Sequence, residues 1–260
     1  MAYAPFDLTG KVALVTGGNG GIGLGMADAM AQAGASIAIW GTNEDKNRTA
    51  EASLKQHGVK VISRKVDVSN ETQVAQAMKD TVTALGRIDA VFANAGIGSG
   101  ARSFIDMTTE QYRKVLAVNL DGVFFTMREA ARHMRERAAN GDKGGSLIGI
   151  ASLAAIEGAA RNEHYAATKG GVLSMMRSIA VEFARDGVRA NTILPGWIAT
   201  DMTAGAQASP AFAEKVIPRV PMRRWGEPAD FGGIAVYLAS NASAFHTGDT
   251  FILDGGYAIY

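Results

Sequence analysis

The sequence has 260 residues, 47% of them hydrophobic, which suits one large α/β domain better than two small ones. Its 26 basic and 25 acidic side chains nearly cancel, which argues against nucleic acid or an anionic membrane as the main partner. Cysteine is absent, which excludes disulfides, thiolate nucleophiles and thiolate metal sites. The first 18 residues lack a basic region followed by an apolar one, and no apolar run reaches the roughly 20 residues of a membrane span, so we expect a soluble, cytoplasmic protein.

Short apolar runs alternate along the chain with longer segments typical of helices. The expected strands cover residues 11–16, 36–40, 60–66, 89–93, 146–150, 189–193 and 250–253. The expected helices cover residues 24–33, 46–57, 71–85, 109–137, 165–186 and 228–240, with Ser69 and either Thr108 or Thr109 as N-caps. This order predicts an α/β fold, a doubly wound parallel sheet of about seven strands with helices on both faces, which forms a single Rossmann domain over residues 1–260.

The side chains suited to chemistry follow the carboxyl ends of the predicted strands, where ligands bind in such sheets. Five glycines between positions 17 and 23 join the first strand to a helix. A turn of this kind lets the backbone approach a pyrophosphate, which the free N–H groups of the helix start then face. Asp67, Asn94, Ser152 and Pro195 follow four later strands. The segment 197–224 is rich in proline and small residues and is predicted to form a substrate lid.

Tyr165 and Lys169 are four residues apart, so on a helix they share one face. An ammonium about 4 Å from a phenolate contributes on the order of 4 kcal/mol at an effective dielectric constant near 20. That energy corresponds to lowering the tyrosine pKa from about 10 by roughly two to three units. The pair therefore predicts a tyrosine that acts as a base near neutral pH.

Taken together and in this order, the motifs resemble those of the short-chain dehydrogenase/reductase family over residues 8–257. The family motifs appear here as TGGNGGIG at 16–23, ANAG at 93–96 in place of NNAG, Asn119 in VNLDG, Ser152, YAATK at 165–169, Pro195-Gly196 and DGG at 254–256. Ser152 precedes Tyr165 by 13 residues, as is usual in the family. One glycine motif alone would mean little, but the full ordered set is specific.

The resemblance implies an NAD(P)-dependent oxidoreductase that transfers a hydride between nicotinamide and a secondary alcohol or ketone. In that scheme Tyr165 is the general acid/base that exchanges a proton with the substrate oxygen, and Ser152 hydrogen-bonds the same oxygen. Lys169 binds the nicotinamide ribose and lowers the Tyr165 pKa. Asn119 holds a water that links Lys169 to solvent. These four residues are the expected catalytic set.

The resemblance also implies which residues line the cofactor and substrate sites. The expected cofactor contacts are Gly17, Asn19, Gly20, Gly21, Ile22, Gly23, Thr42, Asn43, Asp67, Val68, Asn94, Ala95, Gly96, Tyr165, Lys169, Pro195, Gly196, Ile198 and Thr200. The expected substrate contacts are Ile97, Ser152, Ala154, Arg161, His164, Trp197 and Met202. For His164, a pocket or surface position is favoured over a role as second base. The four histidines show no metal-ligand spacing, so no metal is expected.

The cofactor preference is left open by the residues themselves. Family members that prefer NADP often have a basic residue where this chain has Gly20 and an arginine near Thr42, whereas those that prefer NAD have an aspartate in place of Gly41. All three signals are missing. Glu44 and Asp45 either repel a 2′-phosphate or form the solvated first turn of the next helix. The missing cations favour NAD over NADP.

Two alternative functions remain. One is a 3-oxoacyl-[acyl-carrier-protein] reductase, which docks an acidic carrier through arginines. Arg132 matches one such arginine, but the second position is Asp186, which has the wrong sign, so a small-molecule substrate is favoured. The other alternative is a non-catalytic nucleotide-binding protein, because fold does not fix function. The family likeness further implies a homotetramer.

Overall fold

The structure is a computed structural model and describes residues 3–98 and 100–260. Seven parallel strands form one sheet in the order β3-β2-β1-β4-β5-β6-β7. The strands are β1 (Val12–Thr16), β2 (Ser36–Gly41), β3 (Val61–Lys65), β4 (Ala90–Ala93), β5 (Gly145–Ile150), β6 (Val188–Pro195) and β7 (Thr250–Leu253). The predicted fold class is confirmed.

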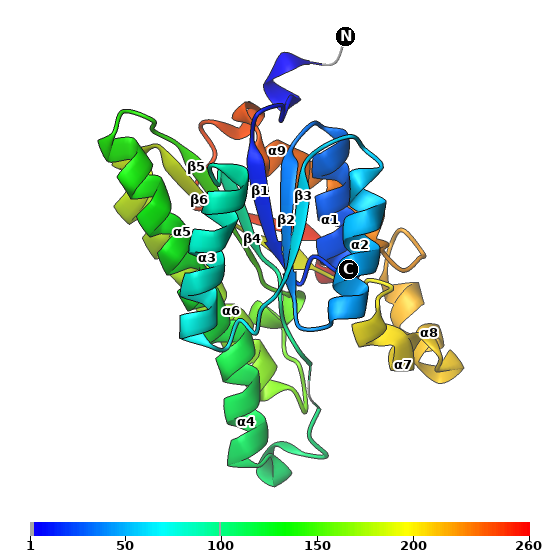
Figure 1. Cartoon of the computed structure of the whole chain (residues 1–260). Coiled ribbons are helices and arrows are strands. Elements are labelled where there is room, and N and C mark those ends of the chain that lie inside the picture. The colour runs from blue at the N-terminus through cyan, green and yellow to red at the C-terminus, as the bar shows by residue number, and fades with distance from the viewer. Residues whose placement is uncertain (1–2, 99) are drawn as a thin grey trace.

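Helices cover both faces of the sheet (Figure 1). The helices are α1 (Gly21–Gln32), α2 (Glu44–Lys55), α3 (Glu71–Leu85), α4 (Thr109–Leu116), α5 (Gly122–Ala139), α6 (Glu163–Phe183), α7 (Ala204–Gln207), α8 (Pro210–Val216) and α9 (Gly232–Ala239). Helices α3, α5 and α6 pack on one face of the sheet, and α1, α2 and α9 pack on the other. Neighbouring strand residues serve opposite faces, because Leu14 belongs to the first core and Val15 to the second.

The strand order reverses at β1, which has β2 on one side and β4 on the other. A crevice opens beyond the carboxyl ends of the strands at such a point, and it is the usual ligand site of a doubly wound sheet. In register, Thr16 is paired with Trp40 of β2 and with Ala93 of β4. The glycine turn after Thr16 therefore lies between the ends of these neighbouring strands.

The start of α1 and the N-cap of α3 differ from their predictions, whereas α3 spans the predicted residues 71–85. Helix α1 begins at Gly21 rather than residue 24, directly after the turn. The N-cap of α3 is Asn70, whose side chain accepts from the Gln73 N–H. The prediction of Ser69 as this cap was wrong, because the Ser69 hydroxyl instead donates to the Asp67 carboxylate at 2.7 Å.

The long helix predicted over residues 109–137 is interrupted. Thr108 caps its start with a reciprocal pair of hydrogen bonds to Gln111, as predicted. After Leu116 the backbone widens into a π-helical turn, Ala117–Asp121, and α5 follows. Such turns occur often at functional sites, and this one contains Asn119.

The segment 197–224 follows the carboxyl end of β6 and forms short helical pieces, α7 and α8 among them. Its first residues run beside Gly226, two residues beyond its end, because the Ala199 N–H donates to the Gly226 carbonyl and the Gly226 N–H donates to the Trp197 carbonyl. A third apolar cluster packs this segment against the residues that follow β5 and against the end of the chain. It consists of Leu153, Val216, Val220 and Tyr257.

Candidate active site

The glycine turn adopts its tight conformation only because Gly17 and Gly23 have no side chains. Gly17 has a φ of 63°, a conformation that residues with a Cβ rarely adopt. A Cβ on Gly23 would collide with the Gly17 carbonyl oxygen and lie 2.5 Å from the Asn94 amide nitrogen. Backbone N–H groups at the start of α1 have no partner within their own helix. This arrangement fits the pyrophosphate of a dinucleotide.

Asn94 supports the turn from the neighbouring strand end. Its side-chain amide donates to the carbonyls of Thr16 and Gly17 at 3.0 and 3.2 Å. The Thr16 hydroxyl accepts from the N–H groups of Asn94 and Ala95, both at 3.0 Å. The amide nitrogen of Asn94 is therefore committed to positioning the turn, whereas its Oδ1 has no partner among the hydrogen bonds of the described residues.

Gly41 is the last residue of β2, and the side-chain amides of Asn19 and Asn47 pack against it. Asn19 donates to Asn47 at 2.7 Å, and Asn47 donates to the carbonyls of Gly41 and Arg64. A Cβ on Gly41 would collide with both Asn19 and Asn47. The buried Asn47 was missed by the sequence analysis, where its only signal was a polar residue on the inner face of a helix.

The residues after Gly41 settle one open alternative. Asn43 is the N-cap of α2, and its side chain accepts from the Lys46 N–H at 2.9 Å. Glu44 and Asp45 form the exposed first turn of that helix, where carboxylates are favoured by the helix dipole. Thr42 is also exposed. The helix-start interpretation of the two acids is confirmed.

Beyond β3, the two residues expected at the adenine differ in exposure. Asp67 is exposed, and its Oδ1 accepts from both the N–H and the hydroxyl of Ser69. Val68 is buried against α5, since a Cβ on Gly122 would lie 2.8 Å from its methyl group. One carboxylate oxygen of Asp67 has no partner among the hydrogen bonds of the described residues and is available to a ligand.

Three of the four expected catalytic residues lie at the end of β5 and the start of α6. The Lys169 ammonium donates to the Ile150 carbonyl at 2.8 Å and lies 5.5 Å from the centre of the Tyr165 ring. Burial lowers the pKa of Lys169 to about 8. The Ser152 hydroxyl accepts from the Ala154 N–H at 3.2 Å, and its hydrogen bond with Tyr165 favours the phenolate.

The predicted low pKa of Tyr165 was wrong. Burial of the phenol raises its pKa and outweighs the opposing hydrogen bond from Ser152. The Lys169 ammonium does not offset this, because its bond points to the Ile150 carbonyl rather than to the phenol oxygen. The phenol is therefore protonated near neutral pH and is poised as an acid.

Asn119 completes the group from the π turn. Its fully buried side chain accepts from the Ile97 N–H at 2.8 Å and donates to the Ile97 carbonyl at 2.9 Å. A Cβ on Gly96 would lie 3.4 Å from the Asn119 oxygen and 3.6 Å from the Lys169 nitrogen. Asn119 and Lys169 therefore converge on Gly96, and the Asn119 side chain fixes the loop that follows β4.

The 197–224 segment reaches both sides of the crevice. A Cβ on Gly21 would lie 3.2 Å from the Thr200 methyl, and one on Gly98 would lie 3.8 Å from Met202. Ile198 is buried, and its carbonyl accepts from the Thr203 hydroxyl at 2.6 Å. These contacts bring the predicted residues of this segment against the glycine turn and the loop after β4.

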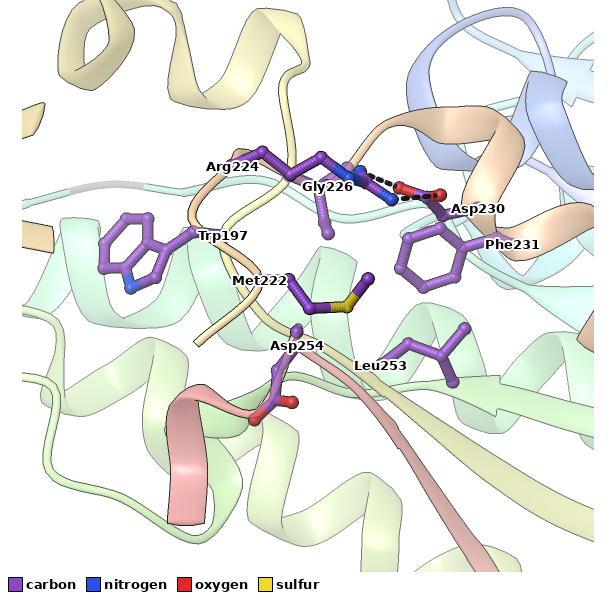
Figure 2. Close-up of a pocket in the computed structure, with 10 residues that line it drawn as sticks. Trp197, Met222, Arg224, Gly226, Asp230, Phe231, Leu253 and Asp254 are labelled. Carbon is purple, nitrogen blue, oxygen red and sulfur yellow. Dashed lines mark hydrogen bonds and ion pairs between the residues drawn. The ribbon is translucent and has the colours of Figure 1, made fainter. Parts of the chain in front are cut away.

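Trp197 is one of the residues that line a cavity of about 210 Å³, which is shown in Figure 2. Its ring packs against Phe212 at 4.9 Å and Trp225 at 6.1 Å between ring centres. The cavity is lined by Trp197, Ile198, Met222, Arg224, Gly226, Asp230, Phe231, Leu253, Asp254 and Gly255. Below it, the Pro195-Gly196 turn packs on the DGG turn, because a Cβ on Gly196 would lie 2.6 Å from the Asp254 side chain.

His164 is only 1% exposed, and among the described residues neither of its ring nitrogens has a hydrogen-bond partner. This rules out the surface position that the sequence left open. Within residues 3–98 and 100–260, no group of three or more histidine and carboxylate side chains could hold a metal ion. In the same residues, none of the helices has both the length and the apolar character needed to cross a membrane.

The site combines a glycine turn, a half-buried Tyr165 beside the buried Lys169, and Ser152, all at the carboxyl edge of a doubly wound sheet. This combination is typical of a nucleotide-dependent oxidoreductase. Comparison with known proteins gives the family. A family model described as enoyl-(acyl carrier protein) reductase matches residues 17–258. The chain belongs to the short-chain dehydrogenase/reductase family, and it is an NAD(P)-dependent oxidoreductase.

Relatives act on several substrates. The chain is 36% identical to L-rhamnose 1-dehydrogenase (NAD(P)(+)) of Azotobacter vinelandii, over 96% of this chain and 97% of the relative. It is 33% identical to a 3-oxoacyl-[acyl-carrier-protein] reductase of Chlamydia pneumoniae, over 96% and 97%. A solved gluconate 5-dehydrogenase from Burkholderia cenocepacia, in complex with NADP and tartrate, is 34% identical with a TM-score of 0.92, over 98% of both chains.

Proposed function

We propose that this protein oxidises a secondary hydroxyl of a small polyhydroxylated substrate, or reduces the matching ketone, with Tyr165 as the proton donor and acceptor. The observation that supports this most directly is the convergence of Lys169 and Asn119 on Gly96, with Tyr165 on the same turn of α6 as Lys169. A non-catalytic nucleotide-binding protein would not need a buried ammonium with a depressed pKa.

A nicotinamide cofactor supplies the hydride, and the glycine turn, Asn19, Thr200 and Lys169 are the residues that would hold it. The protein supplies proton transfer and position. Tyr165, protonated in the free protein, gives its proton to the substrate oxygen during reduction and takes it back during oxidation. Ser152 hydrogen-bonds the same oxygen. The Lys169 ammonium stabilises the phenolate as it forms.

The first test is Tyr165→Phe. We expect turnover to fall at least 10³-fold, while the dissociation constant for the cofactor changes less than threefold, because only the phenol oxygen is lost. Fluorescence titration with NADH and steady-state rates measure the two quantities. Tyr112→Phe, which removes a phenol oxygen from an exposed position on α4, serves as the matched control and should change neither quantity. If Tyr165→Phe retained a tenth of the rate, the assignment of the acid/base would be wrong.

The second test is a screen of secondary alcohols with NAD⁺ and NADP⁺, covering sugars, sugar acids, cyclic diols and steroids. We expect turnover of polyols above steroids, because the predicted contacts mix polar and apolar groups, among them Ser152, Arg161 and Trp197. Turnover confined to acyl thioesters would favour the carrier-protein reductase. That alternative is weaker, because Asp186 and Arg132 are already paired with Arg135 and Glu129.

We further propose NAD as the preferred cofactor. The position after Gly41 has no arginine, and Lys46, the nearest cation on α2, is paired with Asp201 at 2.6 Å. Titration with NADH and NADPH measures the ratio of their dissociation constants. A ratio near one would show that the Thr42 region accepts both.

The remaining predictions concern organisation. The segment 197–224 is proposed to act as a substrate lid of a single domain spanning residues 1–260, because its start is hydrogen-bonded to Gly226 just beyond its end, and Thr200 and Met202 reach Gly21 and Gly98 at the crevice. A homotetramer is proposed from the family likeness and from exposed apolar side chains such as Val181 on α6. Light scattering at micromolar concentration would refute it by giving a monomer mass. A cytoplasmic location stays a prediction.

A further inference from the structure

Two carboxamide side chains link the glycine turn to the ends of β2 and β3. Asn19 lies in the turn, and its amide nitrogen donates to the Asn47 oxygen at 2.7 Å. Asn47 is on α2 and only 3% exposed, and its amide nitrogen donates to the carbonyls of Gly41 and Arg64 at 3.0 and 3.1 Å. The hydrogen bond between Asn19 and Asn47 therefore connects segments that only the folded chain brings together.

The orientation of both amides follows from the two backbone carbonyls. A carbonyl oxygen only accepts hydrogen bonds, so the atom of Asn47 that faces Gly41 and Arg64 must be its nitrogen. Both hydrogens of that nitrogen are then used, and the Asn47 oxygen faces Asn19. This oxygen requires a donor, so Asn19 turns its nitrogen toward Asn47 and its oxygen away. The backbone thus decides, through Asn47, which atom Asn19 can offer to a ligand.

The Asn19 oxygen is available for binding. Asn19 is half-buried, and its Oδ1 has no partner among the hydrogen bonds that the described residues form. The buried polar atoms without a partner in the same part of the chain do not include this oxygen, so solvent reaches it. An acceptor of this kind suits a hydroxyl group and disfavours a phosphate, whose oxygens are acceptors as well.

The Asn19 carboxamide lies where a carboxylate side chain would begin. In dinucleotide folds, an acid at the end of the second strand accepts from the 2′-hydroxyl of the adenosine ribose. Here β2 ends at Gly41, and a Cβ on Gly41 would collide with the Asn19 nitrogen and lie 2.7 Å from its carboxamide carbon. A side chain at position 41 and the Asn19 carboxamide therefore exclude one another. A carboxamide has the planar shape of a carboxylate, and here one oxygen remains to accept.

We propose that the Asn19 oxygen replaces this acid and accepts from the 2′-hydroxyl of the adenosine ribose, with Asn47 as the positioning residue that orients it. The inference rests on the proposed preference for NAD and supplies an attractive contact for it. A 2′-phosphate would instead meet an acceptor oxygen, while Lys46 is held by Asp201. Because both partners of the proposed hydrogen bond are uncharged, it should not weaken as ionic strength rises.

The experiment compares NADH with the analogue that lacks the 2′-hydroxyl of the adenosine ribose. Fluorescence titration of the full-length protein gives both dissociation constants and needs no turnover. Wild type is expected to bind the analogue about five- to tenfold more weakly, the range of one hydrogen bond between uncharged groups. Asn19→Ala should bind the two within about twofold of one another, because the acceptor is gone. In this variant the ratio of the NADPH to the NADH dissociation constant should fall at least threefold.

Two variants of Asn47 separate positioning from structural support. Asn47→Ala removes the atom that orients Asn19, so the discrimination between NADH and the analogue should fall below about twofold. Asn47→Asp loses both bonds to the backbone carbonyls but keeps an oxygen that accepts from Asn19. This variant should be less stable than wild type and yet keep the discrimination. A merely structural role would make the aspartate at least as harmful as the alanine.

Gly41→Ala disrupts the same hydrogen bond without altering either amide, because its methyl group would displace the Asn19 carboxamide. The discrimination should fall as it does in Asn19→Ala. The matched control is Asn191→Ala. Asn191 is a fully buried amide on β6 that donates to the His246 carbonyl at 2.9 Å and accepts from the Asp249 N–H at 3.1 Å. Its loss should lower the thermal unfolding temperature and leave the discrimination unchanged.

The outcomes distinguish this inference from the proposed function. Equal binding of NADH and the analogue by wild type, or full discrimination in Asn19→Ala, would overturn the role of Asn19 and leave the oxidoreductase intact. Equal loss of discrimination in Asn47→Asp and Asn47→Ala would overturn the positioning role of Asn47. A wild type that binds NADPH more tightly than NADH, but loses its discrimination in Asn19→Ala, would support the hydrogen bond and contradict the preference for NAD.

Discussion

At the scale of single residues, burial and charge act on Tyr165 in opposite directions, and burial is the larger effect in the protein without ligands. The Lys169 ammonium lies on the same face of α6, as its spacing predicted, but donates to the Ile150 carbonyl. Desolvation raises the pKa of Tyr165 and lowers that of Lys169. Sequence spacing placed the two side chains together, but it could not show how much water surrounds them.

The depressed pKa of Lys169 predicts a specific dependence of stability on pH. Between about pH 8 and 10.5 the unfolded chain binds a proton that the folded protein does not, so the free energy of unfolding rises with pH in this window. The full difference is on the order of 3 kcal/mol at about 1.4 kcal/mol per pKa unit. Urea denaturation of the cofactor-free protein at several pH values measures it.

Lys169→Met should remove this rise between pH 8 and 10.5, because methionine has no proton to lose. Lys215→Met is the matched control, since Lys215 is exposed and should leave the slope unchanged. The same slope in Lys169→Met and in wild type would show that another group is responsible.

Two glycines of the turn should respond differently to the same added methyl group. Gly23→Ala puts a Cβ against the Gly17 carbonyl, so we expect the cofactor dissociation constant to rise at least 100-fold. Gly20→Ala puts a Cβ where no atom lies within 4 Å, and its φ of −179° suits any residue. Its dissociation constant should rise less than fivefold. Titration of both variants with NADH measures the two dissociation constants. An equal rise in both would contradict the role of Gly23 in the glycine turn.

At the scale of elements, the π turn and the 197–224 segment depend on contacts distant in sequence. A π turn has no residue signature of its own, and here it places Asn119 against the backbone of Ile97. The last part of the segment is fastened by Arg224, whose two nitrogens bind the Asp230 carboxylate at 2.6 and 2.8 Å (Figure 2). This pair lowers the pKa of Asp230 to about 2.

Arg224→Gln should loosen the segment without unfolding the protein. Both side chains are more than a third exposed, so the ion pair contributes less than about 1 kcal/mol to global stability. We expect amides between residues 197 and 226 to exchange hydrogen several-fold faster, with the rest of the chain unchanged. Lys215→Gln, a charge change within the same segment, is the control. Unchanged exchange in Arg224→Gln would show that the apolar cluster alone holds the segment.

At the scale of the whole molecule, the two ends of the sheet have separate tasks. The carboxyl ends of the strands carry the candidate site. At the opposite end, the buried Asp89 accepts from the Val12 N–H at 2.9 Å and from Arg87, while Arg137 lies 3.3 Å away. This network joins the start of β1 to the loop before β4 and to α5. It should therefore affect stability and not chemistry.

Asp89→Asn tests this separation. Losing one charge of a buried ion pair should reduce the free energy of unfolding by about 3 kcal/mol, while kcat/KM changes less than twofold. Asp142→Asn is the matched control, because Asp142 contacts the same Arg137 at 2.8 Å but is half exposed. We expect it to cost less than about 1 kcal/mol. A large fall in kcat/KM for Asp89→Asn at full folding would contradict the separation.

The sequence by itself determined the strand and helix order, the glycine turn and the positions of Ser152, Asn119, Tyr165 and Lys169. These features rest on local patterns, such as apolar runs, glycines at a turn and helical spacing, which the chain carries wherever it folds. Only the tertiary structure decided the sign of the Tyr165 pKa shift, the hydrogen bonds of the Asn94 amide nitrogen to the turn, and the burial of His164 and Asn47. Each of those depends on desolvation or on contact between segments far apart along the chain, and neither quantity is written in neighbouring residues.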